Sequence, residues 1–121
     1  MATLTESVHT GEFLVSESNN TLSREQVQLA PELDLLAGTV LGKIAATDTY
    51  VPLDLLSVEG SQRAAGILYN NTTTGGSTGE AVIIARGAEV DKQLLIWPSV
   101  ITEEQLNVAL SELSELGIIL R

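Results

Sequence analysis

The sequence predicts a small, mainly β fold that carries one C-terminal α-helix, an α+β arrangement of 121 residues. Three observations lead to this prediction. Short apolar stretches recur between residues 26 and 85, separated by Gly, Pro, Asn and Thr, as in a chain of short strands and turns. After residue 101, apolar residues recur instead at helical spacing, with signals for both helix ends. The length fits one domain with a single core.

The apolar stretches of the central region predict strands. The alternation of polar and apolar residues in 26–29 is typical of an edge strand. The uninterrupted apolar run 81–85 predicts a strand that is covered on both faces. The stretch 70–79 is rich in Asn, Thr and Gly and predicts a mobile hairpin loop. In chain order, the predicted strands are 26–29, 38–45, 50–53, 64–69 and 81–85.

The C-terminal helix is expected at about 102–116. Thr102 is its N-cap and forms a Thr-x-x-Gln capping box with Gln105, and Gly117 supplies the left-handed residue that ends a helix. The apolar stripe consists of Leu106, Ala109, Leu110, Leu113 and Leu116. The residues that follow, 118–120, have strand character, and we expect them to return to the core beside 94–97.

The only tryptophan lies in an apolar run directly before a proline. A lone tryptophan in this setting is usually buried in the core, and the proline ends the strand. The alternative is a carbohydrate-stacking platform, which an exposed indole would favour. We expect burial, with the following residues as the core anchor: Trp97, Pro98, Leu106, Leu110 and Leu113.

The first part of the chain differs in composition from the rest. Residues 1–22 are rich in Thr, Ser, Glu and Asn and contain one apolar patch, Phe13-Leu14-Val15. Such a segment buries too little apolar surface to offset the entropy of ordering, which predicts a flexible or extended arm on a body of residues 23–121. The patch is either the first strand of the body or a strand that adds to the sheet of a partner.

Charge and residue usage exclude several classes of function. A net charge of −10 without any cluster of Lys or Arg opposes binding to nucleic acid. The chain has no cysteine for thiolate metal sites, and its one histidine, His9, lies in the predicted arm. We expect no cofactor, no metal and no catalytic site. No apolar run is long enough to span a membrane and no signal peptide is evident, so we expect a soluble protein made in the cytosol.

The order and spacing of several segments resemble those of the head decoration protein family of tailed bacteriophages. The segments are 12–16, 36–42, Ala65-Gly66-Ile67-Leu68, Ala85-Arg86-Gly87, Leu95-Ile96-Trp97-Pro98 and Gly117-Ile118. The resemblance covers most of the chain. The chain differs from the family in its regular, Leu-rich helix and in its long Gly/Thr loop at 70–79.

The resemblance implies a β-clip-like fold and a structural role in the virion. Proteins of this kind bind the outer surface of the expanded capsid as trimers at threefold sites and stabilise it against the pressure of packaged DNA. The implied partners are the major capsid protein and further copies of the chain. The arm is expected to add a strand to the major capsid protein, with contacts from Thr5, Glu6, Phe13, Leu14 and Val15.

Two other classes of function remain open at this stage. A small β-clip enzyme, such as a nucleotide hydrolase, would need a cluster of acids and a metal site that the sequence does not display. A sugar-binding module displayed on a particle would use Trp97 or Tyr69 as an exposed stacking platform.

Overall fold

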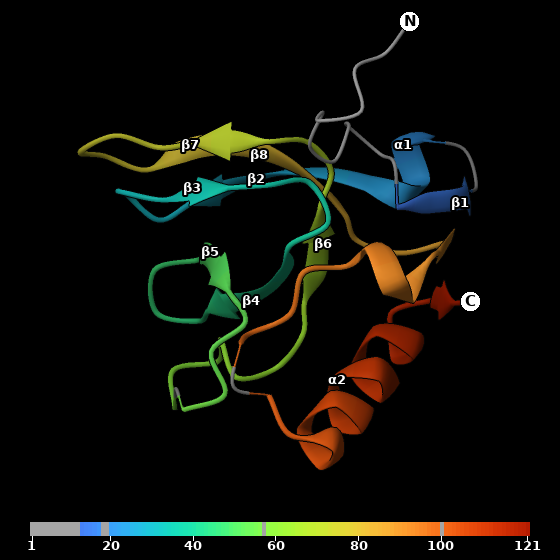
Figure 1. The fold of residues 1–121 in the computed structure, drawn as a ribbon. Helices are drawn as coiled ribbons and strands as arrows, with labels where there is room; N and C mark the ends of the chain where they lie inside the picture. Colours follow the sequence, from blue (N-terminus) through green and yellow to red (C-terminus); the bar gives the residue numbers. More distant parts are fainter. Residues whose placement is uncertain (1–12, 18–19, 57, 100) are drawn as a thin grey trace, which may run out of the picture.

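A closed barrel of five strands forms the centre of the computed structural model, which describes residues 13–17, 20–56, 58–99 and 101–121 (Figure 1). Around the barrel the strands follow in the order β2, β5, β4, β6, β8. Neighbouring strands are antiparallel, except that β2 and β5 are parallel. The barrel strands are β2 (Arg24–Leu29), β4 (Val40–Ile44), β5 (Thr49–Pro52), β6 (Gly66–Leu68) and β8 (Gly79–Ile84).

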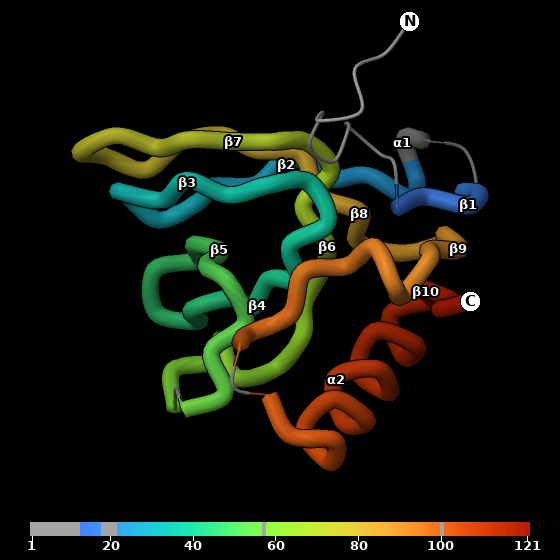
Figure 2. Tube along the Cα trace, in the orientation of Figure 1, coloured from blue at the N-terminus to red at the C-terminus, as the bar shows by residue number. Residues whose placement is uncertain are grey.

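A second sheet and one long helix lie outside the barrel. The sheet has the order β1, β9, β10, and Figure 2 shows β9 between the other two strands. Two short strands, β3 and β7, pair separately. The remaining elements are β1 (Leu14–Glu17), α1 (Asn20–Ser23), β3 (Asp34–Leu35), β7 (Thr72–Thr73), β9 (Ala88–Val90), the 3₁₀ turn η1 (Lys92–Leu94), α2 (Glu103–Glu115) and β10 (Ile118–Leu120). The predicted mainly β fold with a C-terminal helix is confirmed.

The barrel strands β4, β6 and β8 are buried on both faces, because neighbouring residues of a strand point to opposite sides. One side faces the barrel interior, whose cluster is Leu29, Leu41, Tyr50, Leu68, Ala81, Ile83 and Ala85. The other side contributes Val40, Ile67 and Ile84 to a second cluster, which also contains buried residues of α2, β9 and β10. The prediction that 81–85 is covered on both faces agrees with this arrangement.

One expectation about the central region holds in part and one is wrong. Residues 26–28 pair on one side only, with β8, as in an edge strand, whereas Leu29 also pairs with β5 and so closes the barrel. The stretch 70–79 is not simply a loop. Its β7 pairs with β3, and the buried Thr74 donates a hydrogen bond from its hydroxyl to the carbonyl of Ala30. Pairing between segments far apart in the sequence produces this difference.

The helix α2 has the predicted ends. Thr102 and Gln105 form both hydrogen bonds of the capping box, and Gly117 has a φ of 88°. Of the predicted stripe, Ala109 and Leu113 are fully buried, Leu106 and Leu110 are half-buried, and Leu116 is 37% exposed. The buried stripe is therefore shorter than predicted, because it ends before Leu116.

The strand after α2 forms as predicted, but beside a different partner. β10 runs parallel to β9, with Ile118 opposite Ala88, and not beside 94–97. The segment 94–97 lies instead against the start of β4, where the amide of Ile96 donates to the carbonyl of Gly38 over 2.8 Å. The left-handed turn at Gly117 directs the chain toward β9.

The apolar patch at the N-terminus belongs to the body. Phe13 is fully buried in the outer cluster, and the amide of Asp91 donates to its carbonyl over 2.8 Å. Leu14 begins β1, which pairs antiparallel with β9. The placement of Phe13, Leu14 and Val15 in a free arm is thus corrected to the other alternative, a first strand of the body. Of the predicted arm, residues 1–22, the structure assigns 14–17 to β1 and 20–22 to α1, while residues 1–12 and 18–19 lie outside the described residues.

Gly42 is expected to be the least replaceable glycine of the barrel. A Cβ on Gly42 would lie 2.2 Å from the carbonyl oxygen of Ser61, which is held by a hydrogen bond from the amide of Asp54. We expect Gly42→Ala to lower the free energy of unfolding by about 1–3 kcal/mol in urea denaturation, since the backbone must move to relieve the overlap. Gly75→Ala is the control, because its Cβ would meet no atom within 4 Å. An equal effect of both substitutions would contradict the close packing at Gly42.

Candidate functional site

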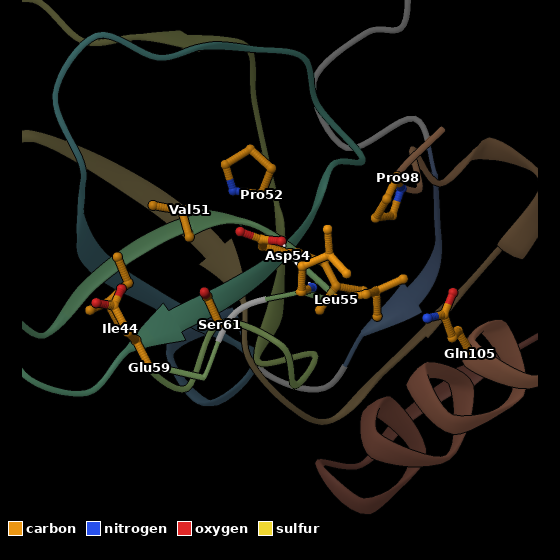
Figure 3. A pocket seen from close by; sticks show the side chains of 11 residues that line it. Ile44, Val51, Pro52, Asp54, Leu55, Glu59, Ser61, Pro98 and Gln105 are labelled. Atoms are coloured by element: carbon orange, nitrogen blue, oxygen red, sulfur yellow. Dashed lines mark hydrogen bonds between the residues drawn. The ribbon is translucent and has the colours of Figure 1, made fainter. Parts of the chain in front are cut away.

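An apolar hollow lies where the connection between β5 and β6 meets the first turn of α2 (Figure 3). Its volume is about 530 Å³. Figure 3 shows Gln105 of α2 on one side, Ile44 and Glu59 on the other, and Leu55 between them. The apolar lining consists of Ile44, Val51, Pro52, Leu53, Leu55, Leu56 and Pro98.

A second hollow of about 250 Å³ adjoins the first, and the two share Pro52, Leu53 and Pro98 as lining residues. Its own lining is also mostly apolar and adds Leu35, Leu36, Val40, Ile96 and Trp97. We call the two hollows together the Pro52–Pro98 groove. The predicted core anchors Trp97 and Pro98 thus border a surface groove, although Trp97 also packs against the outer core cluster.

Two large apolar side chains of the connection between β5 and β6 project into solvent. Leu56 is 89% exposed and Val58 is 91% exposed, and Leu56 lines the first hollow. Single exposed apolar residues are ordinary on protein surfaces, but a contiguous apolar area with a groove marks an interaction site. Sequence reasoning missed this site. The signal available was the Leu55-Leu56-Ser57-Val58 run, which lies between two predicted strands and outside any apolar periodicity.

The groove carries acidic and no basic side chains. Asp54 and Glu59 line the first hollow and Asp34 lines the second, and no Lys or Arg of the described segments lines either. Basic side chains lie elsewhere, and five of the six Lys and Arg side chains of the described segments pair with an acid of the same chain. The ion pairs are Arg24–Glu17, Lys43–Asp48, Arg63–Glu112, Arg86–Glu25 and Arg121–Glu89.

The C-terminal end of β1 is held by a polar cluster. Arg24 Nη2 lies 2.5 Å from Glu17 Oε1, and the hydroxyl of Ser23 donates to the same carboxylate. The guanidinium of Arg24 also covers the ring of Tyr69, 4.0 Å from the ring centroid. This cluster joins β1 to β2.

The ionisation of Glu17 reflects this cluster. Burial raises the pKa of its carboxyl, but the hydrogen bonds from Arg24 and Ser23 and the positive charge of Arg24 together leave the pKa below its ordinary value. The pKa of Arg24 is raised in turn, chiefly by its hydrogen bond to Glu17. The charged pair is therefore favoured in the folded protein.

Among the described residues, no three His, Cys, Asp or Glu side chains gather as metal ligands, and His9 lies outside them. Asp54, Glu59 and Ser61 line the first hollow, and no His or Lys of the described segments lines it. Of the aromatic platforms considered for sugar binding, Tyr69 is covered by Arg24 and Trp97 is half-buried. No helix within the described ranges is long and apolar enough to cross a membrane.

The predicted site residues thus separate into three groups. Thr5 and Glu6 fall outside the described residues. Phe13 and Leu14 contribute to the core, while Val15 on β1 is exposed. Of the predicted core anchors, Leu113 is fully buried in the outer cluster, whereas Leu106 and Leu110 are half-buried. Trp97 and Pro98 are half-buried and line the groove, so the expected burial of Trp97 is only partial.

A family model described as bacteriophage lambda head decoration protein D matches residues 3–118 of the chain. The match covers nearly the whole sequence, including the N-terminal segment, the barrel and α2. A search of curated proteins gives no match.

The lowered pKa of Glu17 predicts a pH-dependent contribution to stability. That contribution is complete above the unfolded carboxyl pKa of about 4.3 and is lost as the pH falls through the lower folded value. We expect Glu17→Gln to lower the melting temperature at neutral pH and to flatten its decline between about pH 5 and pH 3. Thermal unfolding followed by circular dichroism measures both effects.

Glu80→Gln is the matched control, because Glu80 is exposed and its carboxylate accepts a hydrogen bond from the amide of Gln26. This variant should keep the decline of the wild type. Parallel declines of wild type and Glu17→Gln would show that the cluster does not contribute.

Proposed function

The chain belongs to the family of bacteriophage lambda head decoration protein D, and from this we propose that it binds the outer surface of the expanded phage head and stabilises it. The observation that carries the proposal is the match over residues 3–118. The family is structural, which fits a role in the virion without catalysis. The proposed partners are the major capsid protein and two further copies of the chain in a trimer at threefold sites.

The proposed mechanism is stabilisation by mass action. A protein that binds the assembled shell and not its ruptured or dissociated states shifts the equilibrium toward the shell by an amount that grows with occupancy. A closely packed body with exposed apolar surface supports such a role, since β4, β6 and β8 are buried on both faces. Such a body can transmit force between neighbouring shell subunits without deforming.

Residues 1–12 are the proposed arm, and they are proposed to add a strand to the major capsid protein. Strand addition gains affinity from main-chain hydrogen bonds and needs few specific side chains, which suits a segment of Thr, Ser and Glu such as the one that includes Thr5 and Glu6. The burial of Phe13 and the pairing of β1 with β9 support a fixed base for the arm. Three such arms on one trimer would bind with avidity.

The proposal is tested with expanded, undecorated heads of the phage that encodes this chain. Purified protein is mixed with the heads, and binding is measured by sedimentation together with the temperature at which the heads rupture. Saturable binding that raises the rupture temperature supports the function. A protein that neither binds nor protects the heads would overturn it.

Deletion of residues 2–12 separates the arm from the body. We expect this variant to keep the melting temperature of the free protein, since β1 and Phe13 remain, and to bind heads at least about tenfold more weakly. A variant with residues 2–12 in scrambled order is the length-matched control, and it should bind more tightly than the deletion because strand addition depends mainly on main-chain hydrogen bonds.

A longer deletion, of residues 2–17, should instead destabilise the body, because it removes β1 and a fully buried phenylalanine. The arm hypothesis fails if the protein without residues 2–12 binds and protects heads as well as the full chain.

A further inference from the structure

We propose that the Pro52–Pro98 groove is a second contact with the shell, in addition to the arm, and that it binds a segment of the capsid protein that is apolar and flanked by Lys or Arg. This inference rests on the proposed function and deepens it by naming the surface and the chemistry of its partner. It is drawn from the shape, exposure and charge of the groove.

The fold leaves apolar surface uncovered at the groove. The walls of the groove are mostly Pro, Leu, Ile and Val side chains, among them Leu56, which is 89% exposed, and Val58 in the same connection is equally exposed. Burying apolar surface of this kind stabilises a complex. An occupant therefore needs apolar side chains to fill the groove and to cover Leu56.

The groove is also formed in advance. Two of its walls carry prolines, whose φ is fixed, and a third is the first turn of α2. There the side chain of Gln105 is held by the capping box, in which its carbonyl accepts from the amide of Thr102 over 3.0 Å. A site with fixed walls binds without an ordering cost of its own.

The acidic side chains of the groove indicate which residues should lie at the ends of the bound segment. Asp34, Asp54 and Glu59 lie along the groove, and the described residues place no Lys or Arg there. Complementary potential across an interface requires cationic side chains on the other partner, which speed association and fix its register. An apolar segment with Lys or Arg at its ends would fill the groove and would also complement its negative charge.

The same charges argue against a second copy of this chain as the occupant. The chain carries a net charge of −10. Within the described segments, five of its basic side chains already pair with its own acids. A second copy would thus bring mainly negative charge to an acidic groove, and like charges in contact oppose binding.

Photo-crosslinking on decorated heads identifies the occupant directly. A benzoylphenylalanine is placed at position 56, where the native side chain is 89% exposed, and at position 22 as a control, where Leu22 is 61% exposed and away from the groove. We expect position 56 to crosslink to a capsid-protein peptide that contains Lys or Arg. Crosslinks from position 56 to another copy of this chain, or no crosslink to capsid protein, would overturn the proposal.

Binding by substituted proteins gives the second measurement. Leu56→Ser with Val58→Ser should bind undecorated heads about tenfold more weakly while keeping the melting temperature, because both side chains are exposed. Leu22→Ser with Ile119→Ser removes comparable exposed surface elsewhere and should bind like wild type. Equal binding by both double variants would overturn the role of the groove.

The contribution of the acidic side chains of the groove is tested separately. Asp54→Asn keeps an acceptor for the amide of Leu56 and removes one charge from the groove. Its affinity for heads should fall about two- to fivefold at low salt and match wild type at high salt, with Glu80→Asn as the control outside the groove. A salt dependence equal to that of wild type would overturn the charge argument. If wild-type protein itself fails to bind heads, the proposed function fails, and this outcome is distinct from the failure of the groove alone.

Discussion

The burial of β4, β6 and β8 on both faces is the constraint on which the rest of the structure depends. Neighbouring residues such as Leu41 and Val40 enter different clusters, one inside the barrel and one outside it. A small barrel can fill its interior with its own side chains, but the outer face needs another layer. The helix α2 and the sheet of β1, β9 and β10 supply that layer. Elements near both ends of the chain, β1 on one side and β9, α2 and β10 on the other, therefore cover the barrel.

That cover is incomplete, and the uncovered part is the surface proposed for binding. The helix and outer sheet protect Val40, Ile67 and Ile84, whereas the segment after β5 carries Leu56 and Val58 into solvent. A larger outer layer would have buried this apolar surface without changing the core. The groove between β5 and α2 consequently holds apolar side chains that the fold itself does not bury.

The family and the structure support the proposed function from different sides. The match over residues 3–118 identifies a structural protein of the phage head. The structure adds a rigid body, an N-terminal segment that starts from the fixed position of β1, and an acidic apolar groove on the barrel. A cement protein needs at least two separate contacts to hold neighbouring shell subunits together, and the arm and the groove are the two that we propose.

The sequence by itself determined the features that depend on neighbouring residues. The capping box of Thr102 and the left-handed Gly117 set the ends of α2 through local hydrogen bonds and backbone sterics, and the apolar runs located the barrel strands. Only the tertiary structure decided which strands pair, that Phe13 fills the core, and that Leu56 and Trp97 border a groove. These outcomes depend on contacts between residues far apart in the chain, whose energies no local pattern encodes.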